Sequence, residues 1–555
     1  MLALKIDGQY IDLPDDFSFT MNLKSPLFGD VGSYSYPFRV PATPRNAMIL
    51  GFPHRIENTN DLYRDMPSTF EWNGLSIFSG TARFKSINRK TYEGIVFDSN
   101  GNFYYQLQNR GLHQVDFGSM SFATECEALI YLSNAANNYY PGSILACPMI
   151  HDQTYFDPPT DNTDLQWLNF THWMTWPVAG TGCAAVLRAT SEQVPGVRTI
   201  ITPMLYLRYV LDKIFEGLGY TLDDQMFSSH PDFSRLVLFN ATNANCPFGS
   251  GYVPENYTLT HLYFNNHIPR VPLNDFIKGL EDYFGFGTFV DNVSRTVRLI
   301  PLKAIANSSD YIDFSKNIIS CNIETEGRKK GFKLAMTIEA GDLMLEGLQG
   351  YEKMIMDIYK GSVPTIAELP PFPIGEVGTC YYVENLGQYY QMNTNYSYSQ
   401  TVLMEILMTR FYFRSGEEDL TTIFSNLWSD TALNTATVNT QMTAWKAISP
   451  RLFFAAKDNW AGHPSMMGVH ETVDHSLFYR WETGMYNRFW KEYLTFLVNA
   501  KTVKFQKSMD FLEFRNFDFS RKYMIGGLKY LAKSIQVTMK KDRVMPATLE
   551  CLSCD

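Results

Sequence analysis

The residues best suited to bind a metal lie in one stretch, HPSMMGVHETVDH, which begins at His463. A zinc-protease helix carries two histidines four positions apart, with a glutamate that acts as the base. Here His470, Glu471 and His475 put the histidines five positions apart, about 140° around a helix. His463 would join them only if the stretch folded as a loop. We therefore interpret these histidines as loop residues and predict no metal site.

Cysteines offer a second route to metal or redox chemistry. Eight cysteines spread over 555 residues do not make a disulfide framework, which needs many cysteines in a short chain. Two of them form a C-x-x-C pair near the end of the sequence, where a zinc site would need two more ligands from elsewhere. We expect a frayed tail there. The cysteines are Cys126, Cys147, Cys183, Cys246, Cys321, Cys380, Cys551 and Cys554.

A glycine-rich corner lies within residues 266–302, NHIPRVPLNDFIKGLEDYFGFGTFVDNVSRTVRLIPL. A phosphate-binding loop places its glycines after a strand and before a helix, where free N–H groups face the anion. Gly279, Gly285 and Gly287 fall inside and after an amphipathic segment, where the helix dipole carries negative partial charge. Their spacing also departs from G-x-G-x-x-G. We predict that this corner only turns the chain and binds no nucleotide.

Neighbouring acidic residues are the remaining candidates for catalysis. Asp223–Asp224 and Glu417–Glu418 look like exposed neighbours, and a catalytic carboxylate pair cannot be identified without knowledge of the fold. The sequence contains no G-x-S-x-G, no P-loop and no Cys–His nucleophile pattern. We predict no catalytic residue, no cofactor-binding residue, no cofactor and no enzyme activity. A glycan-degrading activity stays open as an alternative.

Composition narrows the class of protein. Hydrophobic residues make up 45% of the chain, aromatic residues 15% and charged residues 19%, so several cores can form and disorder is excluded. The net charge of −10 argues against stable, sequence-specific nucleic-acid binding, because phosphate binders are normally basic. It suits a surface past which DNA slides. We find neither a signal peptide nor an apolar run of membrane-spanning length, and expect synthesis in a cytoplasm.

Three segments have the apolar spacing of helices. Residues 273–284 place apolar side chains at i, i+3, i+4, i+7 and i+11. Residues 203–218 and 485–500 show similar stripes, which we attribute to core packing. Gly285 and Gly219 directly follow two of these segments, and glycine commonly ends a helix.

Most of the remaining periodicity is that of strands. Asp7-Gly8, Asn73-Gly74 and Gly526-Gly527 each separate two β-like runs, which predicts three tight hairpins. Asn88–Lys90 predicts a fourth turn. Residues 286–301 predict a further hairpin. Between the first two hairpins lies a proline-rich segment, SPLFGDVGSYSYPFRVPATPRNAMILGFPHR (25–55), in which Pro37, Pro41, Pro44 and Pro53 rule out a central strand or a long helix. We expect an ordered, extended loop there.

These elements predict a mainly β protein with α+β insertions, made of several tube-like β-barrel or sandwich domains with a few packed helices. Its length is too great for one ordinary domain. The predicted units are an N-terminal β domain (1–115), a loop-rich insertion (116–200), a helix-plus-hairpin α+β domain (201–330), a β domain with an irregular insertion (331–480) and a C-terminal helix and hairpin that complete a β domain (481–555).

Several stretches, in this order along the chain, resemble tail proteins of tailed bacteriophages, in particular those that infect Bacteroidetes. They are SYPFRVPATPRNAMILGFP, TPMLYLRYVLDKIFEGLGY, the helix-then-hairpin unit of residues 266–302, YNRFWKEYLTFLVNAKTV and KYMIGGLKYLAKSIQVTM. They cover about half of the chain and carry no catalytic position. The helix-then-hairpin unit is also similar to the short helix and strands of tail-hub proteins, which is an analogy of pattern.

The resemblance implies a virion structural protein, the hub or adaptor at the distal end of the tail tube. Such a hub forms a homo-oligomeric ring around the path of the DNA and contacts other tail proteins. It implies a trimer, with a hexamer as the alternative, because two tube-like domains per chain let three copies imitate a six-fold tube. A receptor-binding or glycan-binding tail protein stays open as a further alternative. We expect residues 30–55 and 116–200 to carry much of the intersubunit contact, because they are aromatic without clear periodicity.

Overall fold

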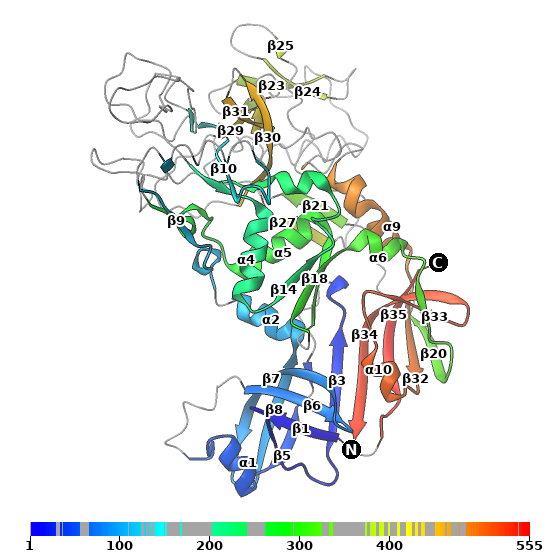
Figure 1. Ribbon diagram of the computed structural model, residues 1–555. Coiled ribbons are helices and arrows are strands. Elements are labelled where there is room, and N and C mark those ends of the chain that lie inside the picture. Colours follow the sequence, from blue (N-terminus) through cyan, green and yellow to red (C-terminus); the bar gives the residue numbers. More distant parts are fainter. Residues whose placement is uncertain are drawn as a thin grey trace.

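The fold is mainly β, as predicted, with α2, α4, α5, α6 and α9 gathered in the middle of the molecule (Figure 1). It is seen in a computed structural model. The structure describes residues 2–28, 34–35, 37–55, 66–108, 110–123, 127–128, 131, 135, 138–148, 150–152, 167–168, 202–240, 261–291, 294–324, 332–336, 372–374, 378–383, 388–392, 398–399, 408–410, 418–424, 428–430, 435–438, 450–460, 463–467, 477, 484–541 and 543–554.

A 14-stranded sheet joins the two ends of the chain. Its path is β2-β1-β6-β7-β8-β4-β3-β34-β35-β32-β20, so strands from the first hundred residues pair with strands from the last fifty. The junction is the antiparallel pair of β3 and β34, from Ser18 opposite Lys540 to Lys24 opposite Ser534.

The first part of this sheet closes into a barrel, which we call the N-terminal barrel (Figure 1, blue). β34 pairs with β3 on one side, and near its end the Lys541 carbonyl accepts a hydrogen bond from the Leu2 N–H of β1 at 3.3 Å. This hydrogen bond brings β1 to the end of β34, although the two strands form no ladder among the described strands. The strands of the barrel are β1 (Leu2–Ile6), β2 (Gln9–Tyr10), β3 (Ser18–Lys24), β4 (Tyr34–Ser35), β5 (Phe38–Pro41), β6 (Met66–Trp72), β7 (Leu75–Ile87) and β8 (Thr91–Asp98).

Two predicted turns and the proline-rich segment lie in this barrel. Asp7-Gly8 and Asn73-Gly74 have positive φ values of 50° and 76°, and of 52° and 79°, as a two-residue hairpin turn of the primed type requires. The proline-rich segment holds no long helix in its described part, but the expectation of no central strand was wrong, because the two-residue strand β4 lies between β3 and β8. It differs from a plain loop, because it contains the four-residue edge strand β5 and the short helix α1 (Pro44–Ile49).

The last part of the sheet is open, and we call it the C-terminal half-barrel (Figure 1, red and orange). It ends at β19 on one edge and at β20 on the other. Gly526-Gly527 forms its predicted hairpin, with φ values of 61° and 86°. Its elements are β19 (Tyr311–Asp313), β20 (Ile318–Glu324), β32 (Thr502–Lys507), α10 (Phe511–Arg515), β33 (Lys522–Ile525), β34 (Leu528–Lys540) and β35 (Ala547–Ser553).

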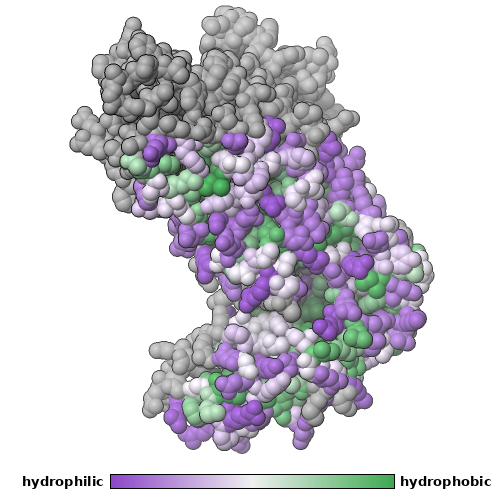
Figure 2. Space-filling view, in the orientation of Figure 1, coloured by the Kyte–Doolittle hydropathy of each residue, from purple (hydrophilic) through white to green (hydrophobic). Residues whose placement is uncertain are grey.

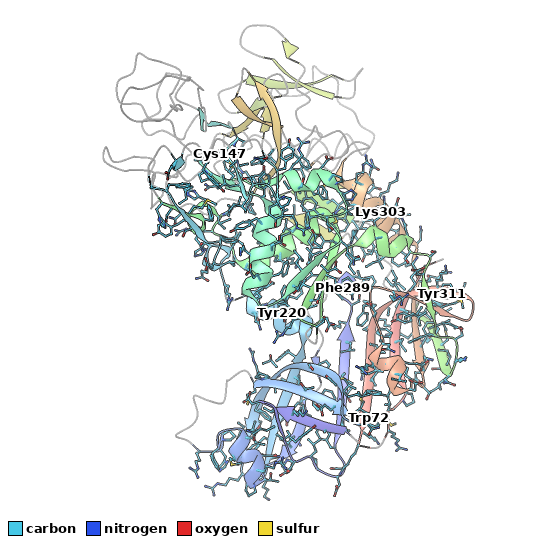
Figure 3. All side chains as sticks on the ribbon, in the orientation of Figure 1. Trp72, Cys147, Tyr220, Phe289, Lys303 and Tyr311 are labelled. Carbon is cyan, nitrogen blue, oxygen red and sulfur yellow. The ribbon has the colours of Figure 1, made fainter. Side chains whose placement is uncertain are left out.

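One hydrophobic core serves both parts of the sheet. It runs from stacked phenylalanines such as Phe19 and Phe70 to Phe505 and Tyr530. Trp72 sits at the boundary between the barrel and the half-barrel (Figure 3), where its ring lies 6.4 Å from that of Phe511 in α10.

A second core fills the middle of the molecule (Figure 1, green). There β14 runs parallel to β18, β17 runs antiparallel to β18, and α2, α4, α5 and α6 contact these strands. The elements are α2 (Ser99–Gln108), α4 (Leu207–Gly217), β14 (Thr221–Asp224), α5 (Leu273–Phe284), β17 (Phe286–Asp291), β18 (Thr296–Pro301) and α6 (Leu302–Asn307).

The predicted helices form, with two changes at their starts. α5 and the following hairpin lie where predicted. α4 begins at Leu207 because Met204–Leu205 pairs with a strand ahead of it, so Pro203 does not start the helix. The predicted helix at 485–500 opens with a π-helical turn, Tyr486–Trp490, before α9 (Lys491–Asn499).

Smaller sheets complete the described part. The helices among the described residues include none that is both long and apolar enough to cross a membrane. The remaining elements are η1 (Pro26–Phe28), η3 (Leu112–Gln114), β9 (Ser119–Ser121), β10 (Leu145–Ala146), β11 (Ile150–Asp152), β12 (Trp167–Leu168), β13 (Met204–Leu205), η5 (Pro231–Arg235), β15 (Leu236–Leu238), β16 (His261–Tyr263), η6 (Phe264–His267), β21 (Phe332–Met336), β22 (Phe372–Ile374), β23 (Gly378–Val383), β24 (Gln388–Met392), β25 (Tyr398–Ser399), β26 (Met408–Arg410), β27 (Glu418–Thr422), β28 (Trp428–Asp430), β29 (Thr435–Val438), β30 (Leu452–Trp460) and β31 (His463–Met467).

The domain boundaries given by the sequence stay predictions. Three strand pairings bear on how the units connect. β19 and β20, which precede residue 330, pair with C-terminal strands, and β32 follows α9 directly into the half-barrel. β3 and β34 hydrogen-bond across more than five hundred residues of sequence.

Candidate assembly surface

The glycine-rich corner packs against neighbouring segments, and this explains its glycines. A Cβ on Gly279 would come within 2.6 Å of the Ile423 side chain, and the Gly279 carbonyl accepts a hydrogen bond from the Thr422 hydroxyl at 2.8 Å. Gly285 ends α5 at φ +64°, with Trp490 against it. The corner therefore lets α5 approach its neighbours closely and turns the chain into the hairpin.

The acidic pair at residues 223–224 is not a pair of exposed neighbours, and this prediction was wrong for one member. Asp223 is exposed, but Asp224 is buried and accepts hydrogen bonds from the Arg208 guanidinium and, at 2.7 Å, from the Phe227 N–H. A buried carboxylate needs such partners because its desolvation is costly. The ion pair between Arg208 of α4 and Asp224 holds the end of β14 against α4. Glu418 lies in β27, and Glu417 lies outside the described residues.

The first cysteine of the C-x-x-C pair lies in an ordered strand and the second directly follows it, so the expectation of a frayed tail was wrong. Cys551 is fully buried at the centre of β35, between β34 and β32, and burial raises the pKa of its thiol. Cys554 follows the strand and is partly buried. The alternation of ATLECLS, with every second residue in the core, is the signal that sequence reasoning missed.

The histidine-rich stretch can be placed only in part. His463 begins β31, while His470, Glu471 and His475 lie outside the described residues. Within the described part of the chain, no three His, Cys, Asp or Glu side chains come together in a way that would hold a metal ion.

Two acidic side chains have shifted pKa values in the middle of the molecule. Burial raises the pKa of Glu281 to about 7 and that of Asp282 to about 6. The Tyr104 hydroxyl of α2 donates a hydrogen bond to the Glu281 carboxylate at 2.7 Å, which ties α2 to α5. Such shifts also occur at catalytic sites. Here the Glu281 carboxyl group accepts a hydrogen bond at the contact between α2 and α5, and we interpret its role as structural.

The outer face of the half-barrel is built from small polar side chains. Directly paired residues of neighbouring antiparallel strands share a face. One row of directly paired residues crosses β3, β34, β35, β32 and β20 and carries only amides and hydroxyls. The next row crosses the same five strands and carries, in order, lysine, serine, glutamate, lysine and asparagine. We call these rows the polar sheet face: Asn22, Gln536, Thr548, Gln506 and Ser320, then Lys24, Ser534, Glu550, Lys504 and Asn322.

Charge on the polar sheet face is largely paired. Lys504 Nζ lies 2.5 Å from Glu324 Oε1, and Lys533 Nζ lies 2.8 Å from Glu550 Oε1. The Thr20 and Thr538 hydroxyls are 2.8 Å apart across the β3–β34 junction. A phosphate-binding surface needs clustered, uncompensated lysine and arginine. Lys504 and Lys533 are thus compensated by acidic neighbours, and most of the other side chains of the face are amides and hydroxyls.

The open edge of the half-barrel is β20. Among the described strands it pairs only with β32, and most of its residues are exposed on both faces. Figure 2 shows hydrophobic residues interspersed with hydrophilic ones over the half-barrel, on the lower right of the molecule. At the other edge, Tyr311 of β19 lies on the outer side (Figure 3) and is 45% exposed.

Comparisons with known proteins give a limited picture. No protein-family model and no curated protein matches the sequence. Among solved structures, the chain is similar to the 43 kDa tail protein of prophage MuSo2 from Shewanella oneidensis, with 7% identity and a TM-score of 0.32, over 100% of this chain and 97% of that one. It is also similar to a tail protein from Neisseria meningitidis MC58, with 7% identity and a TM-score of 0.31, over 100% and 95%. At scores this low, the likeness establishes neither fold nor function.

Proposed function

We propose that the chain is a structural protein of a bacteriophage virion, the hub or adaptor at the distal end of the tail tube, and that it forms a ring through which DNA passes. The observation that carries the proposal is the sheet that joins both ends of the chain and presents the polar sheet face. The ordered resemblance of five stretches to phage tail proteins, in particular of Bacteroidetes phages, supports it from the sequence.

The polar sheet face suits a channel wall for DNA. DNA carries one negative charge per about 1.7 Å of helix axis, so a wall of unpaired lysines would hold it through counterion release. A wall of amides, hydroxyls and lysines paired with acidic residues would not hold the DNA in this way. We therefore assign this face to an uncharged lumen. The net charge of −10 for the whole chain agrees with a surface that does not retain DNA.

The ring is proposed as a homotrimer, with a hexamer as the alternative. Each chain supplies two β units side by side, the N-terminal barrel and the C-terminal half-barrel (Figure 1). Three copies would then place six β units around the axis. Closed rings arise from head-to-tail contacts, and closure also removes exposed sheet edges. Other tail proteins would contact the ring at its two ends.

Immunogold electron microscopy of virions tests the location. An antibody raised against the full chain should label the tail tip, and a second antibody against the capsid serves as the matched control. Label at the head, or no label on intact or detergent-opened particles, would contradict the proposal. Residues 30–55 and 116–200 remain predicted contact segments, and slower proteolysis there in particles than in the free chain is the expected result.

Two other functions give different results in simple assays, and both concern a tail component. A glycan-degrading enzyme would clear a band in a zymogram of host cell wall or capsule; we propose no enzyme activity and expect no clearing. A receptor-binding or glycan-binding protein would bind host cells saturably as an isolated chain; we expect no saturable binding.

A further inference from the structure

The core side of the half-barrel is uncovered at its last strand, β20. Ile323 of β20 pairs directly with Val503 of β32, and directly paired residues share a face. Cys321 pairs in the same way with Phe505. Both partners in β32 are buried, at 4% and 3% exposure. In contrast, Ile323 is 60% exposed and Cys321 is exposed as well, so the apolar face of the sheet extends one strand beyond the point where the chain covers it.

Two further exposed apolar side chains lie beside these residues. Ile319, at the bulge near the start of β20, is 56% exposed, and Leu512 of α10 is 58% exposed. α10 lies next to the start of β20, because its Glu513 carboxylate is 3.1 Å from Lys507, which pairs with Ile318. A group of exposed apolar side chains is typical of an interaction surface. We call this group the apolar edge patch: Ile319, Cys321, Ile323 and Leu512.

The position of β20 in the sheet favours a second copy of this chain as the partner of the patch. The rows of the polar sheet face begin at β3 in the N-terminal barrel and end at β20. Because we assign this face to the lumen and ring contacts run head to tail, the next copy continues the wall beyond β20. Each chain carries its barrel and its half-barrel side by side, so the neighbour presents its N-terminal barrel to β20 (Figure 1).

The N-terminal barrel carries an exposed apolar side chain on the side away from its own half-barrel. Figure 1 shows the short helix α1 on that side. Met48 of α1 is 62% exposed, more than any other large hydrophobic side chain in the described part of the chain. Methionine adapts to irregular apolar surfaces, and proteins commonly cover a sheet edge with a helix. α1 also lies within residues 30–55, which the sequence predicts to carry intersubunit contacts.

The charges of α1 and β20 are complementary. The one charged residue of β20 is Glu324, whose side chain is 36% exposed, and the one charged residue of α1 is Arg45, whose side chain is 56% exposed. Arg45 and Met48 are three positions apart and therefore share a face of the helix, while Glu324 directly follows Ile323. A contact that covers Ile323 with Met48 thus also joins opposite charges, which favours this orientation of the two copies.

We propose that α1 of one copy packs over the apolar edge patch of the next copy, head to tail around the ring. Met48 would lie against Cys321 and Ile323 on the side of the sheet away from the lumen, and Arg45 would lie near Glu324. The inference rests on the proposed function and names the contact that closes the ring. Repetition around the ring covers the patch in every subunit.

Cross-linking tests the contact in the full-length chain. Cys321 is a natural exposed thiol, so Met48→Cys should give disulfide-linked multimers after mild oxidation with copper–phenanthroline in air. Mass spectrometry of the digested multimers should identify a link between positions 48 and 321, and adding Cys321→Ser should abolish that link. The matched control is Leu75→Cys, at a residue 43% exposed in the same barrel, paired with Trp72 at the boundary with its own half-barrel. A link from Leu75→Cys to position 321 of another copy in equal yield, or a Cys321–Cys321 link in the unmodified chain, would overturn the proposal.

Charge substitutions test whether the contact holds the ring together. Met48→Asp and Ile323→Asp should each lower the ring fraction in native mass spectrometry roughly tenfold or more, because each places a charge without a partner in the interface. Far-UV circular dichroism should stay unchanged, because both side chains are exposed in the single chain. Tyr263→Asp, at a residue 55% exposed on β16, is the matched control and should leave the ring intact.

The same measurements separate the failure of this contact from the failure of the proposed function. If the unmodified protein forms no ring, the proposed function fails, and this contact fails with it. If rings form but resist both substitutions, and no link joins positions 48 and 321, only the contact between α1 and β20 fails.

Discussion

The two β parts of the large sheet solve the problem of a sheet edge in opposite ways. The N-terminal barrel closes on itself through the Leu2–Lys541 hydrogen bond and the β3–β34 pairing. The half-barrel shares the same core but stops at β20, with apolar side chains uncovered. Among the described strands, the barrel covers its core within one chain, whereas the half-barrel leaves the apolar side chains of β20 exposed. This difference makes the open edge at β20 the first place to look for a contact between copies in the proposed ring.

The largest expected effect compares two core phenylalanines. Phe70 is fully buried in the closed barrel, 3.5 Å from the Phe19 ring centroid, whereas Phe505 lies beside the open edge. Phe70→Ala should lower the free energy of unfolding of the free chain by about 4–5 kcal/mol, and Phe505→Ala by about 3 kcal/mol. Urea titration of both variants checks this. Equal losses would show that the half-barrel is as closed as the barrel.

The next effect concerns the contact between α2, which follows the last strand of the barrel, and Glu281 of α5. Burial raises the pKa of Glu281 from 4.5 to about 7 in the folded state, so its ionisation destabilises the fold as pH rises through that interval. Glu281→Gln removes this penalty and should raise the free energy of unfolding by about 2–3 kcal/mol at pH 8, and by almost nothing at pH 4.5.

The control for this prediction is Glu216→Gln, an exposed carboxylate of α4 paired with Lys213. It should change the free energy of unfolding by less than about 0.5 kcal/mol at both pH values. A gain for Glu281→Gln that does not vary with pH would show that the carboxyl is not the cause. The contact between α2 and α5 would then need another explanation.

A smaller effect concerns how β20 is held at its start. Lys507 is fully buried, and its ammonium group donates a hydrogen bond to the Lys316 carbonyl at 2.5 Å and lies 3.1 Å from Glu513. Lys507→Met keeps most of the volume and should cost about 2 kcal/mol. Amide hydrogen exchange at residues 316–320 should also become faster. Lys504→Met, on the same strand but partly exposed, should cost less than about 0.5 kcal/mol; equal costs would contradict this account of the anchor.

The smallest effect concerns two turns of the same type, one in each part. Gly74 and Gly527 have φ values of +79° and +86°. Gly74→Ala and Gly527→Ala should each lower the free energy of unfolding by about 1 kcal/mol, because alanine disfavours this region. Thermal melts of the two variants should shift alike. Clearly unequal shifts would mean that the two parts differ in their turns as well as in their edges.

Local sequence was enough to predict the hairpins and α5. The turn pairs Asp7-Gly8, Asn73-Gly74 and Gly526-Gly527 fix their own geometry, and Gly285 ends α5 through its left-handed conformation. The mainly β class followed from the same signals. Each of these features depends on residues that are close in sequence.

Long-range pairing was beyond the reach of one sequence. The junction of β3 with β34 joins residues more than five hundred positions apart, and no local pattern specifies such a partner. Asp224 can be buried because Arg208, which lies in α4 one helix and one turn earlier in the chain, pairs with its carboxylate. The open edge could have been suspected from the alternation of residues 319–323, but only the sheet shows that the apolar face is uncovered.

The mass of the assembled particle tests the central claim most directly. Full-length chain, purified without denaturant, is measured by native mass spectrometry and compared with the chain mass of 63.6 kDa. The account predicts a closed ring of three times this mass, with six times this mass as the alternative. A stable monomer or a dimer as the largest species, both in solution and in complexes released from virions, would contradict the ring and the hub assignment together.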